Sequence, residues 1–382
     1  MNKKFSSKVI VFLVLFFIVA IIYIVSVTSF DNKVNDFCTK TIITLTQQKA
    51  PDDVVLVAVD NHSVDQVSWP WSRDKFADIF NYLEYECGAK AIIFQNIVVF
   101  PDSYNPEKDV EFYNSIEKNK RLINSFILLN SNVAGDVLPA DYYDLFLSKN
   151  KVKIIDGRKK ISNHYYKGVI NLPKAFLEKV NNLGSAILSE DDDGVLRSYM
   201  PVVALNDTLL PSIALSAYSM ATWIDTFVLY DDYLCSNDNC ETLKITIVRK
   251  QTKDYFDNKI DGIYSSIFWF MPNKTSYTHK KYSAIDVLNS AYALKEGKEP
   301  QLSSKLFKNK IVIIGLNADK SVWDQQSETQ VHSRQADMDV HATYVDNLFA
   351  NTFKVDASPY STLLVTFVFC LLSNKINIAL SL

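Results

Sequence analysis

An uncharged apolar segment near the N-terminus constrains this chain more than any other feature. Residues 9–27 read VIVFLVLFFIVAIIYIVSV, 19 residues without a charged side chain. As a helix this run would be about 28 Å long, close to the ~30 Å hydrocarbon core of a bilayer. Lys3, Lys4 and Lys8 precede the run and Asp31 follows it. The positive-inside rule therefore predicts a cytoplasmic N-terminus and an extracytoplasmic location for the chain that follows.

A cleaved signal peptide is the competing interpretation of this segment. Its apolar core would be about 7–15 residues long and would precede a small-residue cleavage site of the A-x-A kind. Residues 9–27 exceed that length, and no such site follows them. The sequence therefore favours an uncleaved anchor in the inner (plasma) membrane.

A second apolar run, residues 363–372, lies near the C-terminus. It is shorter than the roughly 17–25 residues of a membrane span, so a buried core helix is one interpretation. After Lys375, however, residues 376–382 are apolar again. We therefore expect three parts: a cytoplasmic tip with a transmembrane helix (1–30), an extracytoplasmic domain (31–357), and the start of a C-terminal cluster of transmembrane helices in which the sequence ends (358–382).

The distribution of charge argues against a nucleic-acid partner. No acidic residue precedes Asp31 or follows Asp356, and the segment between them carries 36 basic residues against 43 acidic ones. Binding to a phosphate backbone requires a basic surface. The excess of acidic residues therefore predicts a partner other than a nucleic acid.

Cysteine usage leaves two interpretations open. The five cysteines are an odd number and lack the C-x-x-C spacing of zinc sites. Cys235 and Cys240 flank a polar loop, and outside the cytoplasm such a pair can close a small disulfide, whereas two reduced thiols are the alternative. Cys87 falls in an apolar helical stretch and is expected in the core.

Between the apolar ends, predicted strands alternate with predicted helices. The run VVLVAV at 54–59 is typical of a strand buried on both faces, and residues 74–87 have helical spacing up to Gly88. A strand at 91–100 completes a parallel βαβ unit. Further strands are expected at 122–129, 185–188, 200–205, 243–248, 263–270 and 311–315, and further helices at 31–50, 212–223, 283–294 and 340–349.

These elements predict one large α/β domain with a central, mostly parallel sheet flanked by helices, tethered by transmembrane helices. The polar stretch 131–168 is the least regular part of the sequence, and we expect it to leave the sheet.

Motifs of common enzyme classes are absent from the sequence. There is no G-x-G-x-x-G, P-loop, G-x-S-x-G or H-E-x-x-H. His332, Asp337, Asp339 and His341 contain suitable metal ligands but not an established ligand spacing. We interpret them as a solvated loop entering a helix at Val340, and we expect no metal, no cofactor and no catalytic residue.

The first informative segment is the loop that follows the strand at 54–59. Asp60 stands at the end of that strand, Trp69 and Trp71 flank a proline, and Arg73 begins the next helix. Ligands of open α/β sheets bind outside the carboxyl ends of the strands. Arg73 could offer its guanidinium to a carboxylate or phosphate, and Trp71 an apolar wall. The alternative is a structural ion pair between Asp60 and Arg73.

Two further segments carry candidate residues, one in a turn and the other at the end of a strand. In EDDDGVLR, residues 190–197, Asp193 and Arg197 flank an Asp-Gly turn, which by itself predicts only a hairpin. The strand KIVIIG ends at Gly315 and is followed by a long loop and then the helix that contains His341. We expect Asp60 and Gly315 to line one crevice.

Taken in order, these segments resemble the CHASE2 class of extracytoplasmic sensor domain. The resemblance rests on VAVD, WPWSR, GAKAIIF, DDGVLR, PSIAL, KIVIIG and VHATYVD, which extend from residue 54 to residue 349. It implies an N-terminal membrane helix, an external sensor, usually three membrane helices and a cytoplasmic output domain, such as a nucleotide cyclase or a kinase. The family usually has an acid where Gln95 stands, and Asp324 matches the acid of the loop after Gly315.

We therefore expect a membrane-anchored extracytoplasmic (periplasmic) sensory domain of a bacterial receptor that detects a small molecule or an envelope signal. We also expect the chain to form a homodimer with a second copy of itself. The alternatives are an envelope hydrolase that uses Asp60 or His341, and a membrane-anchored binding or scaffold protein. The candidate ligand-binding residues are Asp60, Trp71, Arg73, Asp193, Arg197, Asp324 and His341.

Overall fold

The computed structural model describes most of the chain between residues 28 and 353. The described residues are 14, 16–17, 28–102, 105–129, 139–158, 166–170, 172–253, 259–271, 278–318, 326–331 and 334–353. Two compact units are present: residues 1–42 with 355–382, and residues 43–354. We call the larger unit the body.

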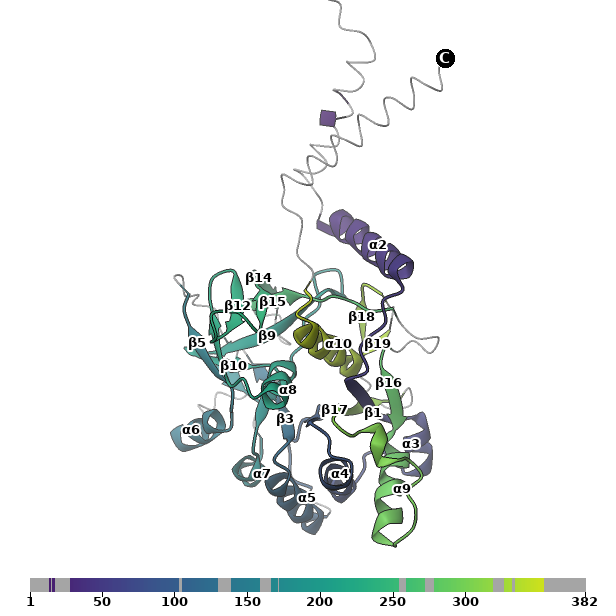
Figure 1. Cartoon of the computed structure of the whole chain (residues 1–382). Coiled ribbons are helices and arrows are strands. Elements are labelled where there is room, and N and C mark those ends of the chain that lie inside the picture. The colour runs from purple at the N-terminus through teal and green to yellow at the C-terminus, as the bar shows by residue number, and fades with distance from the viewer. Residues whose placement is uncertain are drawn as a thin grey trace, which may run out of the picture. The chain divides into compact units, whose positions relative to one another are not determined.

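A six-stranded sheet, parallel at every pairing, forms the centre of the body (Figure 1). This confirms the predicted α/β class with a central parallel sheet. The strand order is β16-β1-β17-β2-β3-β7. The strands are β1 (Val54–Asp60), β2 (Ala91–Phe94), β3 (Leu122–Phe126), β7 (Leu183–Ser185), β16 (Lys280–Ser283) and β17 (Ile311–Asn317).

Both faces of this sheet are buried. Successive residues of a strand point to opposite faces, so Val55 and Val57 of β1 join one hydrophobic core and Leu56 and Ala58 join the other. All four side chains are at most 1% exposed. Continuous apolar strand sequences are the consequence of this two-sided burial.

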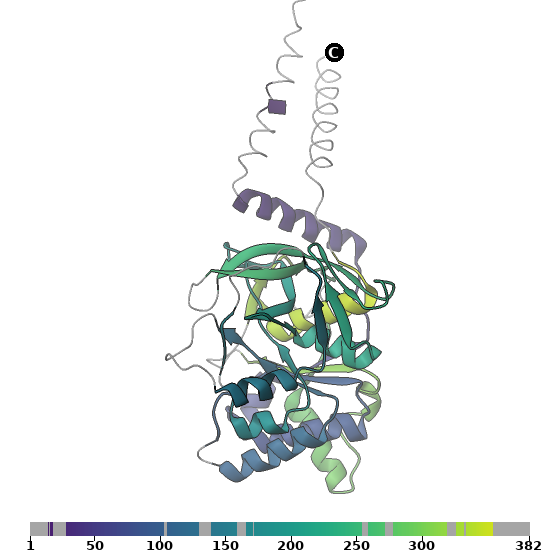
Figure 2. The ribbon, with the colours of Figure 1, turned by 90° about the vertical axis from the view of Figure 1, so that its left-hand side faces the viewer.

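Helices cover the two faces (Figures 1 and 2). The first core contains side chains of α4 (Arg73–Asn81), α5 (Pro106–Lys118), α7 (Lys174–Lys179) and α9 (Ala284–Lys295). The second contains side chains of α8 (Ile213–Thr222) and α10 (Asp337–Ala350). The short helix α3 (Asn61–Gln66) follows β1, and a π-helical turn (Tyr82–Glu86) extends α4.

Antiparallel and mixed sheets form a further layer beyond α8 and α10 (Figures 1 and 2). One sheet has the order β10-β9-β15-β14 and another the order β13-β12-β11-β5. Their strands are β5 (Lys153–Asp156), β9 (Ser198–Leu205), β10 (Thr208–Pro211), β11 (Thr226–Leu229), β12 (Tyr233–Ser236), β13 (Lys244–Thr246), β14 (Val248–Lys253) and β15 (Lys259–Ser266). Because Val202 of β9 and Ile263 of β15 join the second core, α10 is covered on both sides.

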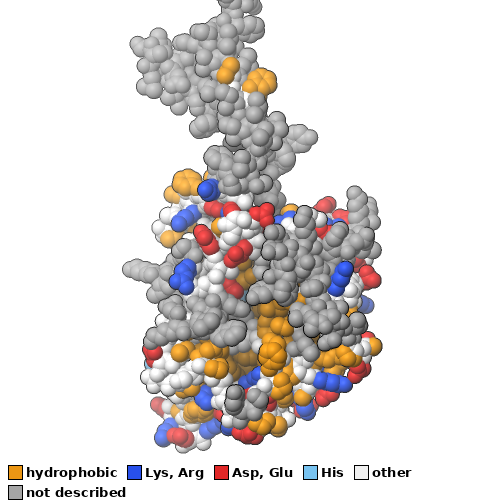
Figure 3. All heavy atoms as spheres, turned by 180° about the vertical axis from the view of Figure 1, so that it is seen from behind, with side chains coloured by type: hydrophobic (Ala, Val, Ile, Leu, Met, Phe, Trp, Pro, Cys, Tyr) orange, Lys and Arg blue, Asp and Glu red, His pale blue; other side chains and the backbone are white. Residues whose placement is uncertain are grey.

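Short elements complete the body. They are β4 (Leu128–Leu129), β6 (Gly168–Val169), β8 (Val195–Leu196), β18 (Gln326–Thr329), β19 (Gln335–Ala336), α6 (Ala140–Ser148) and a 3-10 turn (Ser304–Leu306). On the face shown in Figure 3, hydrophobic side chains gather among acidic and basic ones.

Several element boundaries differ from the sequence predictions. The strand expected at 91–100 ends at Phe94, because the chain leaves the sheet to form a wall of a pocket. The strand expected at 185–188 is shifted to Leu183–Ser185. Helices α5, α6 and α7 were not predicted. The helix expected at 31–50 is α2 (Thr28–Thr46), most of which belongs to the smaller unit.

The predicted membrane segments fall largely outside the described residues. Of residues 9–27, only Val14, Phe16 and Phe17 are described, and they are helical; residues 363–382 are not described. Within the described part of the chain, no helix combines the length and the hydropathy that a membrane span requires.

Gly184 provides a test of the packing between β7 and α8. A Cβ atom at this position would lie 2.6 Å from Cα and 2.8 Å from the backbone nitrogen of Ile213. Because backbone atoms cannot rotate away, we expect Gly184→Ala to lower the free energy of unfolding by about 3 kcal/mol, the upper end of the usual cost of overpacking. A thermal melt of the variant that coincides with that of the wild type would contradict this packing.

Candidate functional site

A pocket lies at the carboxyl ends of the central strands, on the face covered by α4 and α5. Its volume is about 380 Å³. Four segments line it: the loop before α4 with the start of that helix, the end of β2 with the chain that follows it, α5, and the end of β17. The lining residues are Trp69, Pro70, Trp71, Arg73, Phe76, Phe94, Gln95, Asn96, Ile97, Val98, Val99, Phe112 and Leu316.

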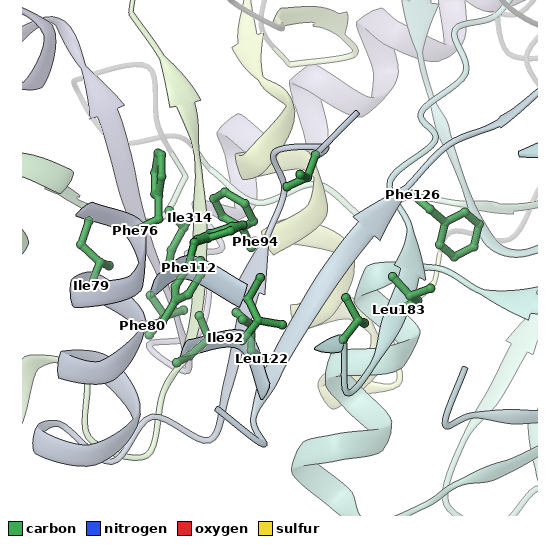
Figure 4. Packing of buried hydrophobic residues seen from close by; sticks show 14 of the residues in the cluster. Phe76, Ile79, Phe80, Ile92, Phe94, Phe112, Leu122, Phe126, Leu183 and Ile314 are labelled. Atoms are coloured by element: carbon green, nitrogen blue, oxygen red, sulfur yellow. The ribbon is translucent and has the colours of Figure 1, made fainter. Parts of the chain in front are cut away.

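Aromatic rings form much of the pocket wall. The ring centroids of Trp71 and Phe76 are 5.8 Å apart, those of Phe76 and Phe94 5.1 Å, and those of Phe94 and Phe112 6.0 Å. Figure 4 shows Phe76, Phe94 and Phe112 converging from α4, β2 and α5. The indole nitrogen of Trp71 donates to the carbonyl of Val67 at 2.9 Å, so this ring is held in place.

Arg73 lines the same pocket but is already paired. Its Nη1 lies 2.6 Å from Oδ1 of Asp109, and its Nη2 donates to the carbonyl of Phe100. Asp109 is only 5% exposed and also accepts from the backbone nitrogen of Asp102 at 2.7 Å and from the hydroxyl of Tyr113 at 3.3 Å. The predicted ligand contact of Arg73 therefore has to compete with a buried carboxylate.

Asp60 connects β1 to β16 instead of facing this pocket. Its Oδ1 accepts from the backbone nitrogen of Ser63 at 3.1 Å, which caps α3, and from the hydroxyl of Ser283 at 2.7 Å. Its Oδ2 is 3.7 Å from Nζ of Lys281. The predicted alternative, an ion pair between Asp60 and Arg73, is therefore wrong, because each of these side chains is bound by closer partners.

Asp193 and Arg197 form an ion cluster at their turn. The guanidinium of Arg197 binds both carboxylate oxygens of Asp193, at 2.7 and 2.8 Å, and Asp191 at 3.0 Å. Lys250 of β14 binds the other oxygen of Asp191. Arg197 is 7% exposed, so the cluster fixes the turn to the antiparallel sheet.

His341 lies inside the body. Its side chain is fully buried on α10, and its Nδ1 is 2.8 Å from the hydroxyl of Tyr199. Burial lowers the pKa of His341 to about 3, so its imidazole is neutral. The prediction of a solvated loop entering a helix at Val340 is wrong, because α10 begins at Asp337 and lies between two sheets.

A buried carboxylate–imidazole–carboxylate triad lies on the same helix. His279 Nδ1 is 2.5 Å from Oδ1 of Asp339, and His279 Nε2 is 2.9 Å from Oδ2 of Asp346. None of the three side chains is exposed. Asp339 also accepts from the backbone of Thr278 at 3.0 Å and from Gln335 at 2.9 Å. The triad therefore ties α10, at Asp339 and Asp346, to the segment that enters β16.

Burial and charge act in opposite directions on this triad. Burial alone would lower the pKa of His279, but Asp339 and Asp346 raise it to about 9. Burial likewise tends to raise the pKa of Asp339, yet His279 holds it below its usual value. The pKa of Asp346 is raised, mainly by burial. His279 is therefore an imidazolium paired with the Asp339 carboxylate at neutral pH.

Gly315 and Gln95 connect the pocket segments to α10. The backbone of Gly315 leaves room for Gln95, because a Cβ atom there would lie 2.6 Å from Oε1 of Gln95 and 3.2 Å from Cβ of Met338. Gln95 is 8% exposed, and its Oε1 has no hydrogen-bond partner among the described residues. The residues that follow β2 thus contact the pocket on one face of the sheet and approach α10 on the other.

The structure brings together only part of the predicted site. Trp71 and Arg73 line the pocket, whereas Asp60, Asp193, Arg197 and His341 do not. Asp324 lies outside the described residues. Sequence reasoning missed Asp109 and the pairing of His279, since both depend on contacts between segments far apart in the chain.

Two further features concern metals and cysteines. In the described ranges, no group of His, Cys, Asp or Glu side chains is arranged to hold a metal ion. Cys235 and Cys240 are joined by a disulfide, with Cα atoms 4.9 Å apart, and Cys87 is buried.

Comparison with known proteins identifies a family. A family model described as the CHASE2 domain matches residues 11–373. No curated protein and no solved structure matches the chain.

The partners of Arg73 lead to a first prediction for the site. We expect Arg73→Ala to lower the free energy of unfolding by about 2–3 kcal/mol, less than the ~3–5 kcal/mol for a fully buried pair, because the Arg73 side chain is 20% exposed. Arg249→Ala is the matched control: it breaks a more exposed pair with Asp231 and should cost at most about 1 kcal/mol. Equal costs in urea unfolding would contradict the structural role of the Arg73–Asp109 pair.

The triad leads to a prediction on pH. The pKa of His279 is about 9 in the folded chain and 6.5 as its ordinary value, so the stabilisation is complete below pH 6.5 and is lost as the pH rises through 9. The wild type should lose on the order of 3 kcal/mol over this window, read as unfolding free energy at each pH.

Two variants make this test specific. His279→Gln should be destabilised by about 3–5 kcal/mol at pH 6, and its unfolding free energy should not decline as the pH rises through 9. His62→Gln, which changes a half-exposed histidine, should keep the decline. A decline of the same size in His279→Gln would assign it to other groups.

Proposed function

Because this chain belongs to the CHASE2 family, whose members are sensory domains of signal-transduction receptors, we propose that it is the extracytoplasmic, membrane-anchored sensory part of such a receptor. We further propose that it detects a small molecule in the pocket beneath the Trp69–Trp71 loop. The pocket is the observation that carries this proposal.

The position of the pocket supports this assignment. Ligands of open α/β sheets bind at the carboxyl ends of the strands, and the pocket is built from the chain after β2, the end of β17 and the loop before α4. Its volume of about 380 Å³ falls within the usual range of roughly 300–1,000 Å³ for small-molecule sites. Its walls are mainly apolar with a few polar groups, which is also typical of such sites.

A conformational change at the pocket would reach the cytoplasmic output domain of the receptor through α10. Occupancy can act only if the ligand has unequal affinity for two conformations. A shift of residues 94–99 would move Gln95 against Gly315 and Met338, and Met338 is at the first turn of α10. α10 and α2 are the helices next to the predicted membrane segments, so their relative movement would be the signal.

An enzymatic function finds less support in the residues proposed for it. Asp60 caps α3 and binds Ser283, and His341 is buried against Tyr199. Neither side chain lines the pocket. A nucleophile and base for an envelope hydrolase would both have to come from other residues.

A thiol probe in the pocket tests both location and function. Ile97, half-buried in the pocket wall, is replaced by cysteine in a Cys38→Ser background, and the chain is joined through membrane helices to a cytoplasmic nucleotide cyclase. Intact cells are treated with a membrane-impermeant methanethiosulfonate. We expect Ile97→Cys to react from outside and the adduct, which occupies the pocket, to change cyclase activity at least twofold.

Val110→Cys is the matched control, since Val110 is 58% exposed on α5 and outside the pocket. It should react from outside without changing the cyclase activity. If both cysteines react only after the membrane is opened, the extracytoplasmic location is wrong. If the Ile97 adduct forms and the activity stays the same, the pocket is not the sensory site.

A further inference from the structure

Buried aromatic rings and half-buried aliphatic side chains line the pocket. Trp69, Trp71, Phe76, Phe94, Phe112 and Leu316 line it together. The rings of Trp71, Phe76, Phe94 and Phe112 pack edge-on or tilted against one another in that order, with centroids 5.1–6.0 Å apart. Figure 4 shows three of these rings side by side. Flat apolar molecules gain most from such a surface, because they bury area and stack at the same time.

Among the described residues that line the pocket, Arg73 is the only charged one. Its charge is balanced by Asp109, which lies 2.6 Å away and is not among the residues that line the pocket. Asp109 is held by the backbone of Asp102 and the hydroxyl of Tyr113, so it is not free to move aside. An incoming carboxylate or phosphate would have to displace a buried carboxylate or lie beside it, and both are unfavourable.

The other polar side chains among the described lining residues are uncharged. Asn96 is half-buried in the pocket wall and can donate and accept hydrogen bonds. A few neutral groups of this kind orient a ligand without selecting a charge.

From this lining, charge balance and volume we infer that the pocket takes an uncharged, largely apolar small molecule with a flat ring system, and that it selects against anions. This inference rests on the proposed sensory function of the pocket and specifies the chemistry of its ligand.

Two probes with the same ring system test the inference. The probes are 2-naphthol, which is neutral at pH 7, and 2-naphthoate, which is an anion. The full chain is labelled with 5-fluorotryptophan in detergent micelles, and the resonances of Trp69 and Trp71 are assigned with Trp→Phe variants. Shifts of these ¹⁹F signals report on the pocket and not on partition into the micelle. We expect 2-naphthol to bind at least tenfold more tightly than 2-naphthoate.

Two variants examine whether the pocket itself binds the probe. Ile97→Trp should fill it and abolish the shifts, whereas Val110→Trp, on the exposed face of α5, should leave them unchanged. Overhauser contacts between naphthol protons and the fluorinated Trp71 locate the probe in the unsubstituted chain, so the test does not depend on the folding of Ile97→Trp.

The charge argument is tested separately with Asp109→Asn, which keeps an acceptor oxygen but removes the balancing charge. We expect this variant to bind 2-naphthoate at least tenfold more tightly than the wild type does. Equal or tighter binding of 2-naphthoate by the wild type would overturn the inference while leaving the pocket a ligand site. If neither probe shifts Trp69 or Trp71, both the inference and the pocket's proposed role are wrong.

Discussion

The burial of the central parallel sheet on both faces is the constraint on which the rest of the body depends. β17 lies in the middle of this sheet and pairs with β1 from Val54↔Ile311 to Asp60↔Asn317. Apolar strands with both faces buried need a layer of helices on each side. The pocket at the carboxyl ends of the strands and the helix α10 behind them are consequences of that arrangement, and they are separated only by the thickness of the sheet.

α10 shows how a polar sequence can be buried at acceptable cost. Asp339, His341, Thr343, Asp346 and Asn347 are all fully buried on this helix. An unpaired buried charge would cost several kcal/mol, roughly 3–5 when one partner of a buried pair is missing. The helix meets this requirement by pairing two of its carboxylates, Asp339 and Asp346, with His279. Its Asn347 amide both donates to and accepts from the backbone of Phe268, at 2.9 Å in each case. Such directional contacts allow few alternative positions, as expected of a helix that we propose transmits a small displacement.

The sequence predicted the class of the fold and the more regular elements, but not how they associate. The apolar runs at 54–59 and 311–315 correspond to β1 and β17, and the helical spacing after Arg73 corresponds to α4. For the site, Trp71 and Arg73 were identified because they follow a strand end. Their partners were not identified, because Asp109 belongs to α5 and Phe94 to β2. Local sequence patterns do not indicate which distant segments lie close together.

The sequence by itself determined which segments are apolar and with what period, and therefore that strands alternate with helices between two apolar ends. It also determined the motif VHATYVD, although not that its polar residues are buried. Only the tertiary structure decided that β17 inserts between β1 and β2, that Asp109 neutralises Arg73, and that His279 lies between two carboxylates of α10. The physical reason is range: periodicity acts over a few residues, whereas strand order and charge pairing depend on the free energy of packing residues that are far apart in the chain.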